Sequence, residues 1–303
     1  GLIGSSDNHT ARAGAGYKEI PRSPMSDAYG LRSDWLEGLG AERDPEPEPV
    51  DPPAGLLAVA HGFERGASFY YTGGLVAVHA PARDRKSIWE ALEARRVYGT
   101  SGDRILLHFK LLDGPKGPVP MGSEVELDSH PRFEVRASGA FEQLPGCPQT
   151  VHDRLSPERI KRLCLGECYH PSDRRLRIER IEVVRIRKQL DPSDSVADLI
   201  EDPWRSFECP ASRAGCRVVF EDPNPDPERE NVYYVRAIQE PTLVSNGSPV
   251  RCERDEHGTC IRARGCPVSG PRFDPQDPCL WEAGERAWSS PIFVQMRDAQ
   301  PSG

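Results

Sequence analysis

The sequence lacks both a long apolar run and an excess of basic residues. Its longest purely apolar stretch, Gly55 to Ala60, is far shorter than the roughly 20 residues a helix needs to span a bilayer. Lysine and arginine total 39 against 47 aspartates and glutamates, for a formal net charge of -8. No basic stripe is present to neutralise a phosphate backbone. We therefore expect no membrane span in this chain and no nucleic-acid partner.

Cysteine is missing from the first 140 residues, and all nine cysteines follow them. This clustering predicts loops cross-linked by disulfides in an oxidising compartment, periplasmic or extracellular. A zinc knuckle is the alternative, but the Cys-x-x-Cys pairs of zinc ribbons are lacking. The odd total leaves one thiol free or paired with a missing segment. The cysteines are Cys147, Cys164, Cys168, Cys209, Cys216, Cys252, Cys260, Cys266 and Cys279.

An initiator methionine is also lacking, and residue 1 begins no signal-peptide pattern. The chain opens on Gly1-Leu2-Ile3-Gly4, which is typical of the end of a buried strand. We therefore expect this chain to be the C-terminal part of a longer protein, whose missing N-terminal segment is its partner.

The 303 residues exceed the usual size of one domain, which favours two. The 30 prolines and 27 glycines predict many loops and few long helices. Residues 74–80 form a short apolar run typical of a buried strand. Arg85 to Arg96 has helical spacing, with Asp84 as the cap and the final arginines at the C-terminal end. A strand followed by a helix is an α/β signature.

After residue 100 the apolar pattern changes to period two. Ile105, Leu107, Phe109 and Leu111 alternate with polar or smaller neighbours, and several later segments resemble them. About six or seven such strands separated by turns predict an antiparallel sandwich. The later segments are 133–137, 176–187 with a slip near Arg180, 216–220, 232–238 and 287–294.

Two local signals refine this picture. Pro291 within the last strand predicts an edge strand. Ser156 followed by Pro157 predicts the start of a short helix that runs to Leu163. Residues 240–286 form a long cysteine-bearing insertion.

The sharpest chemical motif is Gly4-Ser5-Ser6-Asp7-Asn8-His9. A carboxylate and an imidazole two residues apart, just beyond a strand, suit a borderline metal ion. By spacing alone, the favoured explanation of the motif is an aspartate that caps a turn and a surface histidine.

The chain resembles the C-terminal region of the domain-of-unknown-function 3604 family, which is similar to the polymerase-and-histidinol-phosphatase (PHP) metallohydrolases. The resemblance is spread over most of the chain. The residues that carry it are 4–10, 73–75, 87–92, 96–102, 202–204, 234–241 and 287–292.

The resemblance implies a distorted α/β barrel whose strand ends hold two or three divalent metal ions, zinc, manganese or iron. Asp7 and His9 would be the final Asp-x-His ligand pair. The metals would activate a water and polarise a small-molecule ester substrate. The earlier ligand motifs would lie upstream of Gly1. Two ligands do not complete a catalytic site, so this chain alone is predicted to be inactive.

Other residues are candidates for the same site. His61 and Glu64 are further metal ligands or a solvated loop face. Ser6, Tyr98 and Thr100 would line the site, although residues 98–102 also suit a turn that packs against the sandwich. The proline-rich loop from Asp44 to Pro53 has no counterpart in the resemblance, and His79 stands where relatives are expected to have an aromatic residue.

The fold class expected is therefore α/β plus all-β. Residues 1–102 would complete a PHP-like barrel, and residues 103–303 would form a β-sandwich with disulfide-rich loops. The first functional hypothesis is a fragment of a metal-dependent, phosphoesterase-like hydrolase. The second is a non-catalytic sandwich that binds a glycan, an envelope component or a protein partner. Intact upstream ligand motifs would favour the first hypothesis and their loss the second.

Overall fold

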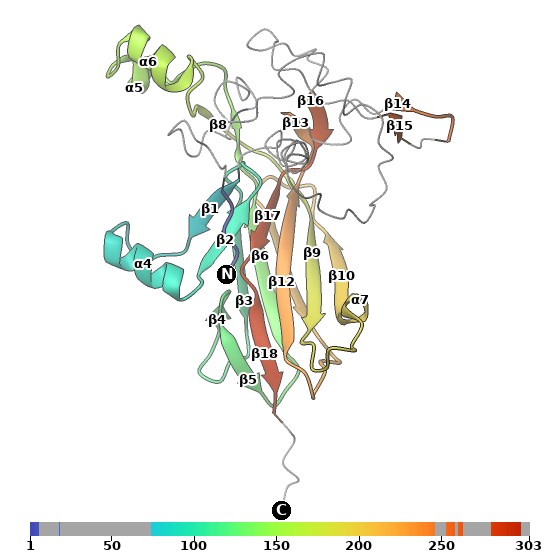
Figure 1. Cartoon of the computed structure of the whole chain (residues 1–303). Coiled ribbons are helices and arrows are strands. Elements are labelled where there is room, and N and C mark those ends of the chain that lie inside the picture. The colour runs from blue at the N-terminus through green and yellow to red at the C-terminus, as the bar shows by residue number, and fades with distance from the viewer. Residues whose placement is uncertain (6–17, 19–73, 246–252, 258–259, 263–279, 298–303) are drawn as a thin grey trace, which may run out of the picture.

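A computed structural model of the chain describes residues 1–5, 18, 74–245, 253–257, 260–262 and 280–297. Two β-sheets packed face to face dominate these residues (Figure 1). The β-rich class expected for the C-terminal part is confirmed. No helix in the described ranges is long and apolar enough to cross a membrane.

The main sheet has eight strands. A path of six runs in the order β1, β2, β17, β12, β18 and β5, and β9 joins the other side of β12 and carries β10. All the pairs are antiparallel except β18 with β5, which is parallel. The strands are β1 (Leu75–Val78), β2 (Val97–Thr100), β5 (Glu124–Leu127), β9 (Ile178–Arg187), β10 (Ile200–Glu208), β12 (Asn231–Gln239), β17 (Arg286–Ser289) and β18 (Ile292–Met296).

The second sheet has four antiparallel strands in the order β11, β6, β3 and β4. Its inward side chains meet those of the main sheet, and the Phe133 and Tyr233 rings lie 4.7 Å apart at the centre of the core. Alternation of buried and outward residues along each strand produces this single core. The strands are β3 (Leu106–Leu111), β4 (Val119–Pro120), β6 (Arg132–Ser138) and β11 (Cys216–Glu221).

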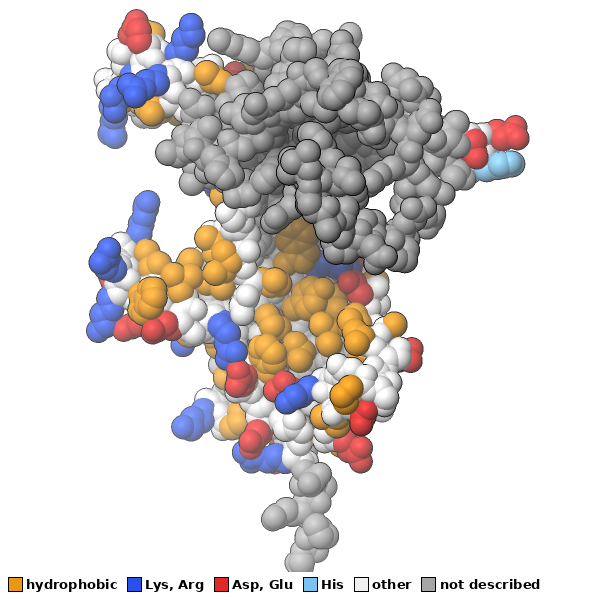
Figure 2. Space-filling model, viewed as in Figure 1, with side chains coloured by type: hydrophobic (Ala, Val, Ile, Leu, Met, Phe, Trp, Pro, Cys, Tyr) orange, Lys and Arg blue, Asp and Glu red, His pale blue; other side chains and the backbone are white. Residues whose placement is uncertain are grey.

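Smaller elements surround the sandwich. The helix α4 (Arg85–Glu93) joins β1 to β2, and α5 and α6 form a separate projection (Figure 1). Figure 2 shows apolar side chains gathered over the main sheet, with charged side chains on α4 and around the rim. The remaining elements are α5 (Gln149–His152), α6 (Pro157–Cys164), α7 (Val196–Leu199), β7 (Phe141–Gln143), β8 (Pro171–Arg175), β13 (Thr242–Ser245), β14 (Glu253–Arg254), β15 (Cys260–Arg262) and β16 (Leu280–Ala283).

Both predicted helix caps are confirmed. Asp84 accepts a hydrogen bond from the Ser87 backbone nitrogen at 2.9 Å, and Ser156 accepts one from that of Arg159 at 3.3 Å. The first helix ends earlier than predicted, because Arg95 takes a left-handed conformation with φ 56. Its final arginines therefore lie beyond the helix.

The bulge expected near Arg180 is confirmed by a register shift in the pairing of β9 with β12. The edge strand expected from Pro291 is wrong. The segment divides at Ser290-Pro291 into β17 and β18, and both lie between two neighbours inside the main sheet. Proline lacks the backbone N–H that a strand interior uses as a hydrogen-bond donor. A break between two strands needs no donor at that position, so it tolerates proline just as an edge strand does.

The purely antiparallel sandwich is also corrected by the parallel pair of β18 with β5. Within the described ranges the sheets are open and no closed barrel is seen. Strands β1 and β2, which the barrel hypothesis assigned to the N-terminal domain, hydrogen-bond into the main sheet through β17. The domain boundary proposed at residue 102 stays a prediction.

Two disulfides join Cys147 to Cys168 and Cys209 to Cys216, and Cys164 is a free, buried thiol. The predicted cross-linking of loops is confirmed for these two pairs, which are compatible with an oxidising compartment. The second disulfide connects the end of β10 in the main sheet to β11 in the second sheet.

Candidate functional site

The first five residues lie against the paired strands β1 and β2 through close backbone contacts at Gly4, Gly74 and Gly99. A Cβ atom on Gly4 would lie 2.7 Å from the carbonyl oxygen of Leu75. A Cβ on Gly74 would lie 3.1 Å from both the nitrogen and the carbonyl oxygen of Ser5. The Leu2 nitrogen also donates to Ser290 Oγ at 3.0 Å. The chain is thus held at Ser5, two residues before Asp7.

Polar side chains from distant parts of the chain meet at the end of the main sheet next to this point. The Ser101 hydroxyl donates to the Glu285 carboxylate and accepts from the Arg286 backbone nitrogen at 2.8 Å. Gln239, at the end of β12, donates to Asp103 Oδ2 at 2.6 Å. Gln239 is fully buried and Glu285 nearly so. These bonds hold two carboxylates in defined orientations.

A cleft of about 240 Å³ opens beside these residues. Four carboxylates and one lysine contribute to its lining, so the cleft is acidic and small. The lysine is Lys18, which is 8% exposed and donates to Glu167 Oε2 at 2.9 Å. Such a cleft suits a small polar ligand with hydroxyl or cationic groups. Its ionisable lining residues are Lys18, Asp103, Glu142, Glu167 and Glu285.

The predicted site residues divide into two groups. Ser6, Asp7, His9, His61 and Glu64 lie outside the described residues, as does the loop from Asp44 to Pro53. Tyr98 and Thr100 lie on β2 and are both 4% exposed. The Tyr98 hydroxyl donates to the Ile105 carbonyl at 3.0 Å, and burial raises its pKa. The Thr100 hydroxyl accepts from the Gly102 nitrogen at 3.3 Å.

His79 packs as an aromatic residue would. Its ring centroid lies 5.3 Å from that of Tyr98 and 4.6 Å from that of His108, and its Nε2 lies 2.9 Å from the Leu107 carbonyl oxygen. Burial and the neighbouring His108 lower the pKa of His79. The neutral imidazole therefore occupies the aromatic position expected at this site.

A second Asp-x-His pair shows what this spacing does without a metal motif. The Asp255 carboxylate accepts from the His257 backbone nitrogen at 2.9 Å, and the imidazole is exposed beside Glu256. Here the aspartate stabilises a turn. The spacing of Asp7 and His9 is therefore not sufficient to indicate a metal site.

The contacts of Ser101 with Glu285 and of Gln239 with Asp103 were not predicted. Each pair is separated by more than a hundred residues, and the polar residues themselves are common at strand ends. No local pattern marks such partners, because only the order of strands in the sheet brings them together.

Comparisons with known proteins agree with the resemblance at the N-terminal end. Residues 1–111 match the family described as "Protein of unknown function (DUF3604)". An uncharacterized protein of Chlamydia pneumoniae is 40% identical over 65 residues, which are 22% of this chain and 10% of that protein. No solved structure matches the chain. The matched family region ends at the last residue of β3, so it includes the glycine contacts, β1, α4, β2 and β3.

Proposed function

We propose that this chain is the C-terminal part of a metal-dependent hydrolase related to the PHP enzymes, acting on a phosphate or related ester. Asp7 and His9 would supply its last metal-ligand motif. The observation that carries this proposal is the anchoring of Ser5 by Gly74, within the segment that matches the family. This contact fixes the position of Ser5, which precedes Asp7 by two residues.

The described residues around Ser5 are suited to support a site. The carboxylates of Asp103 and Glu285 are oriented by Gln239 and Ser101. Oriented, hydrogen-bonded carboxylates are typical of the outer shell that positions ligands and substrates. Asp7 and His9 would hold a divalent ion, zinc, manganese or iron, and that ion when bound would supply a Lewis acid and an activated water.

Two ligands are too few for catalysis, which takes about three protein ligands and an open position. The proposal therefore assigns the remaining ligands, and any barrel around them, to the N-terminal segment of the longer protein. This chain alone is expected to hydrolyse no ester.

The test is the metal content of the full-length protein measured by plasma mass spectrometry. We expect stoichiometric metal in the wild type and its loss in the Asp7→Ala/His9→Ala variant. The matched control is Asp255→Ala/His257→Ala, which removes the same side chains at the same spacing and should keep the metal. Absence of metal from the wild type, or equal loss in both variants, would overturn the proposal.

A second candidate is a binding module for a glycan, an envelope component or a protein. The acidic cleft favours it, because carboxylates beside Phe141 offer hydrogen bonds and an aromatic surface to a hydroxyl-rich ligand. Binding of oligosaccharides by this chain, weakened by Glu285→Gln and unaffected by Asp7→Ala, would favour the module over the hydrolase.

A further inference from the structure

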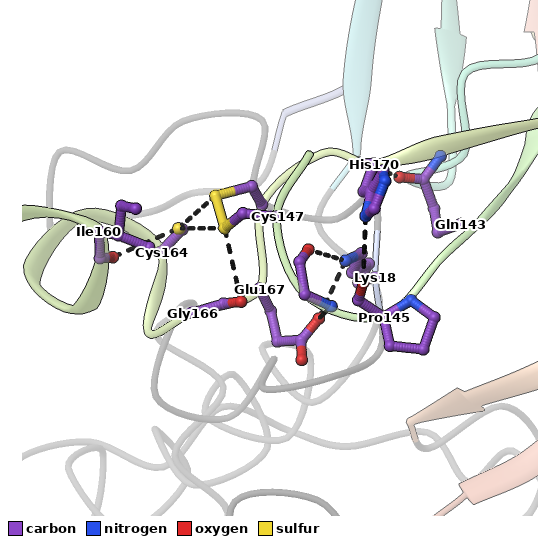
Figure 3. Close-up of a disulfide and its surroundings, with 11 residues drawn as sticks. Lys18, Gln143, Pro145, Cys147, Ile160, Cys164, Gly166, Glu167 and His170 are labelled. Carbon is purple, nitrogen blue, oxygen red and sulfur yellow. Dashed lines mark hydrogen bonds and ion pairs between the residues drawn. A yellow bond between two sulfur atoms is a disulfide. The ribbon is translucent and has the colours of Figure 1, made fainter. Parts of the chain in front are cut away.

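Three sulfur atoms converge at one point of the α5–α6 projection. Cys147 and Cys168 form a disulfide, and the free Cys164 Sγ lies 2.8 Å from Cys168 Sγ and 3.7 Å from Cys147 Sγ. Figure 3 shows the Cys164 side chain pointing toward the disulfide of Cys147. Across the described part of the chain, no other group of three metal-type ligands lies this close together.

The sulfurs belong to a small module with its own apolar cluster. Ile160, Cys164 and Cys168 are buried there, and Val151 and Leu155 are among the residues that pack against them. This cluster is separate from the sandwich core. So few apolar residues rarely hold a module together without a cross-link or a metal. The convergence of three cysteines exceeds what one disulfide requires.

The geometry favours one metal ion in the reduced module. Two thiolates on a tetrahedral zinc with bonds of about 2.3 Å lie about 3.8 Å apart. The separation of Cys147 and Cys164 sulfurs, 3.7 Å, already has this value. Only Cys168 Sγ has to move away from its two neighbours when the disulfide opens. It lies in the turn after α6, beyond Gly166 with φ +90.

We propose that Cys147, Cys164 and Cys168, when reduced, bind one thiophilic cation, with Zn²⁺ the first candidate. Three thiolates without carboxylate or imidazole select zinc or copper(I) over magnesium, calcium or manganese. The fourth position would take water or an added thiol. This soft site is distinct in place and chemistry from the one proposed at Asp7 and His9.

Electrons and protons balance in the conversion of the disulfide state into the reduced, metal-bound state. A dithiol reductant transfers two electrons to the Cys147–Cys168 disulfide, which becomes two thiols while the reductant becomes a cyclic disulfide. Binding of Zn²⁺ by the three thiols then releases up to three protons. In the oxidised state the disulfide holds the module, and in the reduced state the metal holds it.

The test uses the whole chain, which is reduced with a phosphine. The phosphine is then removed in the absence of oxygen. Co²⁺ added to the wild type should produce thiolate-to-cobalt absorption, and Zn²⁺ should abolish it. After gel filtration, the wild type should retain one equivalent of zinc more than the Cys164→Ser variant retains. Zinc should also protect Cys147 and Cys168 from alkylation in the wild type only.

Three controls make the result specific. Oxidised Cys164→Ser keeps both disulfides, so circular dichroism before and after reduction separates loss of binding from loss of folding. Cys209→Ser/Cys216→Ser removes a disulfide that has no third cysteine beside it among the described residues, and this variant should keep the extra equivalent of zinc. Asp7→Ala/His9→Ala should leave the thiolate absorption unchanged. Lack of that absorption in the wild type, or equal zinc in a folded Cys164→Ser, overturns the proposal.

Discussion

Gly4 contacts Gly99 backbone to backbone: a Cβ atom on Gly99 would lie 3.1 Å from the Gly4 nitrogen. The contact joins the first residues of the chain to the middle of β2 and leaves no room for a side chain between them. The contact holds the segment that leads to Asp7. A substitution that disrupts this contact tests whether packing of the segment against the sheet stabilises the chain.

We expect Gly4→Ala to destabilise the chain by about 1–3 kcal/mol, as overpacking of a close contact does. The added methyl would meet the Leu75 carbonyl at 2.7 Å, and a backbone atom cannot turn away as a side chain can. Urea denaturation measures the loss. Val76→Ala changes an exposed residue of β1 and should stay within about 0.5 kcal/mol of wild type. Equal stability of both variants would contradict the contact.

Glu134 should make stability depend on acid pH. Burial alone would raise the pKa of Glu134, but hydrogen bonds from Arg136, Lys110 and Arg217 lower it to about 2. An unfolded glutamate has a pKa of about 4.3. The contribution is therefore complete above the unfolded pKa and is lost as the pH falls toward the folded value of about 2.

In Glu134→Gln, we expect lower stability at neutral pH by about 1–3 kcal/mol and a shallower decline between about pH 4.3 and pH 2. Urea midpoints measured across this range give both quantities. Lys110→Met should shift the decline to higher pH, because one of three cations that favour the carboxylate is removed. Parallel declines in wild type and Glu134→Gln would show that other groups control the acid limb.

Tyr233→Phe should cost about 1.5–3 kcal/mol, the usual range for a hydrogen bond to a charged group. The Tyr233 hydroxyl donates to Asp222 Oδ2 at 2.6 Å, and both residues are fully buried. Arg185 also donates to this carboxylate at 2.8 Å. Chemical denaturation measures the loss. Tyr234→Phe is the matched control, because Tyr234 is the next residue of β12 and faces the opposite side of the sheet. A loss as large in the control would refute the assignment.

The two disulfides should differ in their effect on global unfolding. Cys209 and Cys216, seven positions apart, join the two sheets, so replacing both by alanine should cost about 2–3 kcal/mol. Replacing Cys147 and Cys168 should leave the main transition unchanged, because their cluster is separate from the sandwich core. Thermal melts of the two double variants provide the comparison. A larger effect from the second pair would contradict the separation of the two cores.

Much of the local structure was predictable. The alternation at Ile105, Leu107, Phe109 and Leu111 indicated which side chains are buried, and all four are at most 2% exposed. The caps at Asp84 and Ser156 were predicted because a capping side chain bonds a backbone nitrogen three residues on. Strand β10 was missed, because its polar residues and Pro203 do not alternate as a buried strand does.

Within the candidate site, the sequence indicated the Asp-x-His motif and the residues Tyr98 and Thr100. It indicated neither the strand β2 that carries these two residues nor the polar frame around them. The polar contacts that close the end of the main sheet join residues just after β2 to the last residue of β12 and to the residue before β17. The same holds for Pro291, whose position inside the sheet follows from pairing with β12 on one side and with β2 or β5 on the other.

The sequence by itself determined the alternating core strands and the two capped helices, which of their side chains are apolar and inward, and that cysteine cross-links lie after residue 140. These properties depend on neighbours a few residues away, whose spacing sets both the hydrogen bonds and the buried face. Only the tertiary structure decided the strand order, the cysteine pairs and the meeting of Cys164 with a disulfide. Those depend on contacts between distant residues, which many arrangements of the same strands could satisfy until one core was packed.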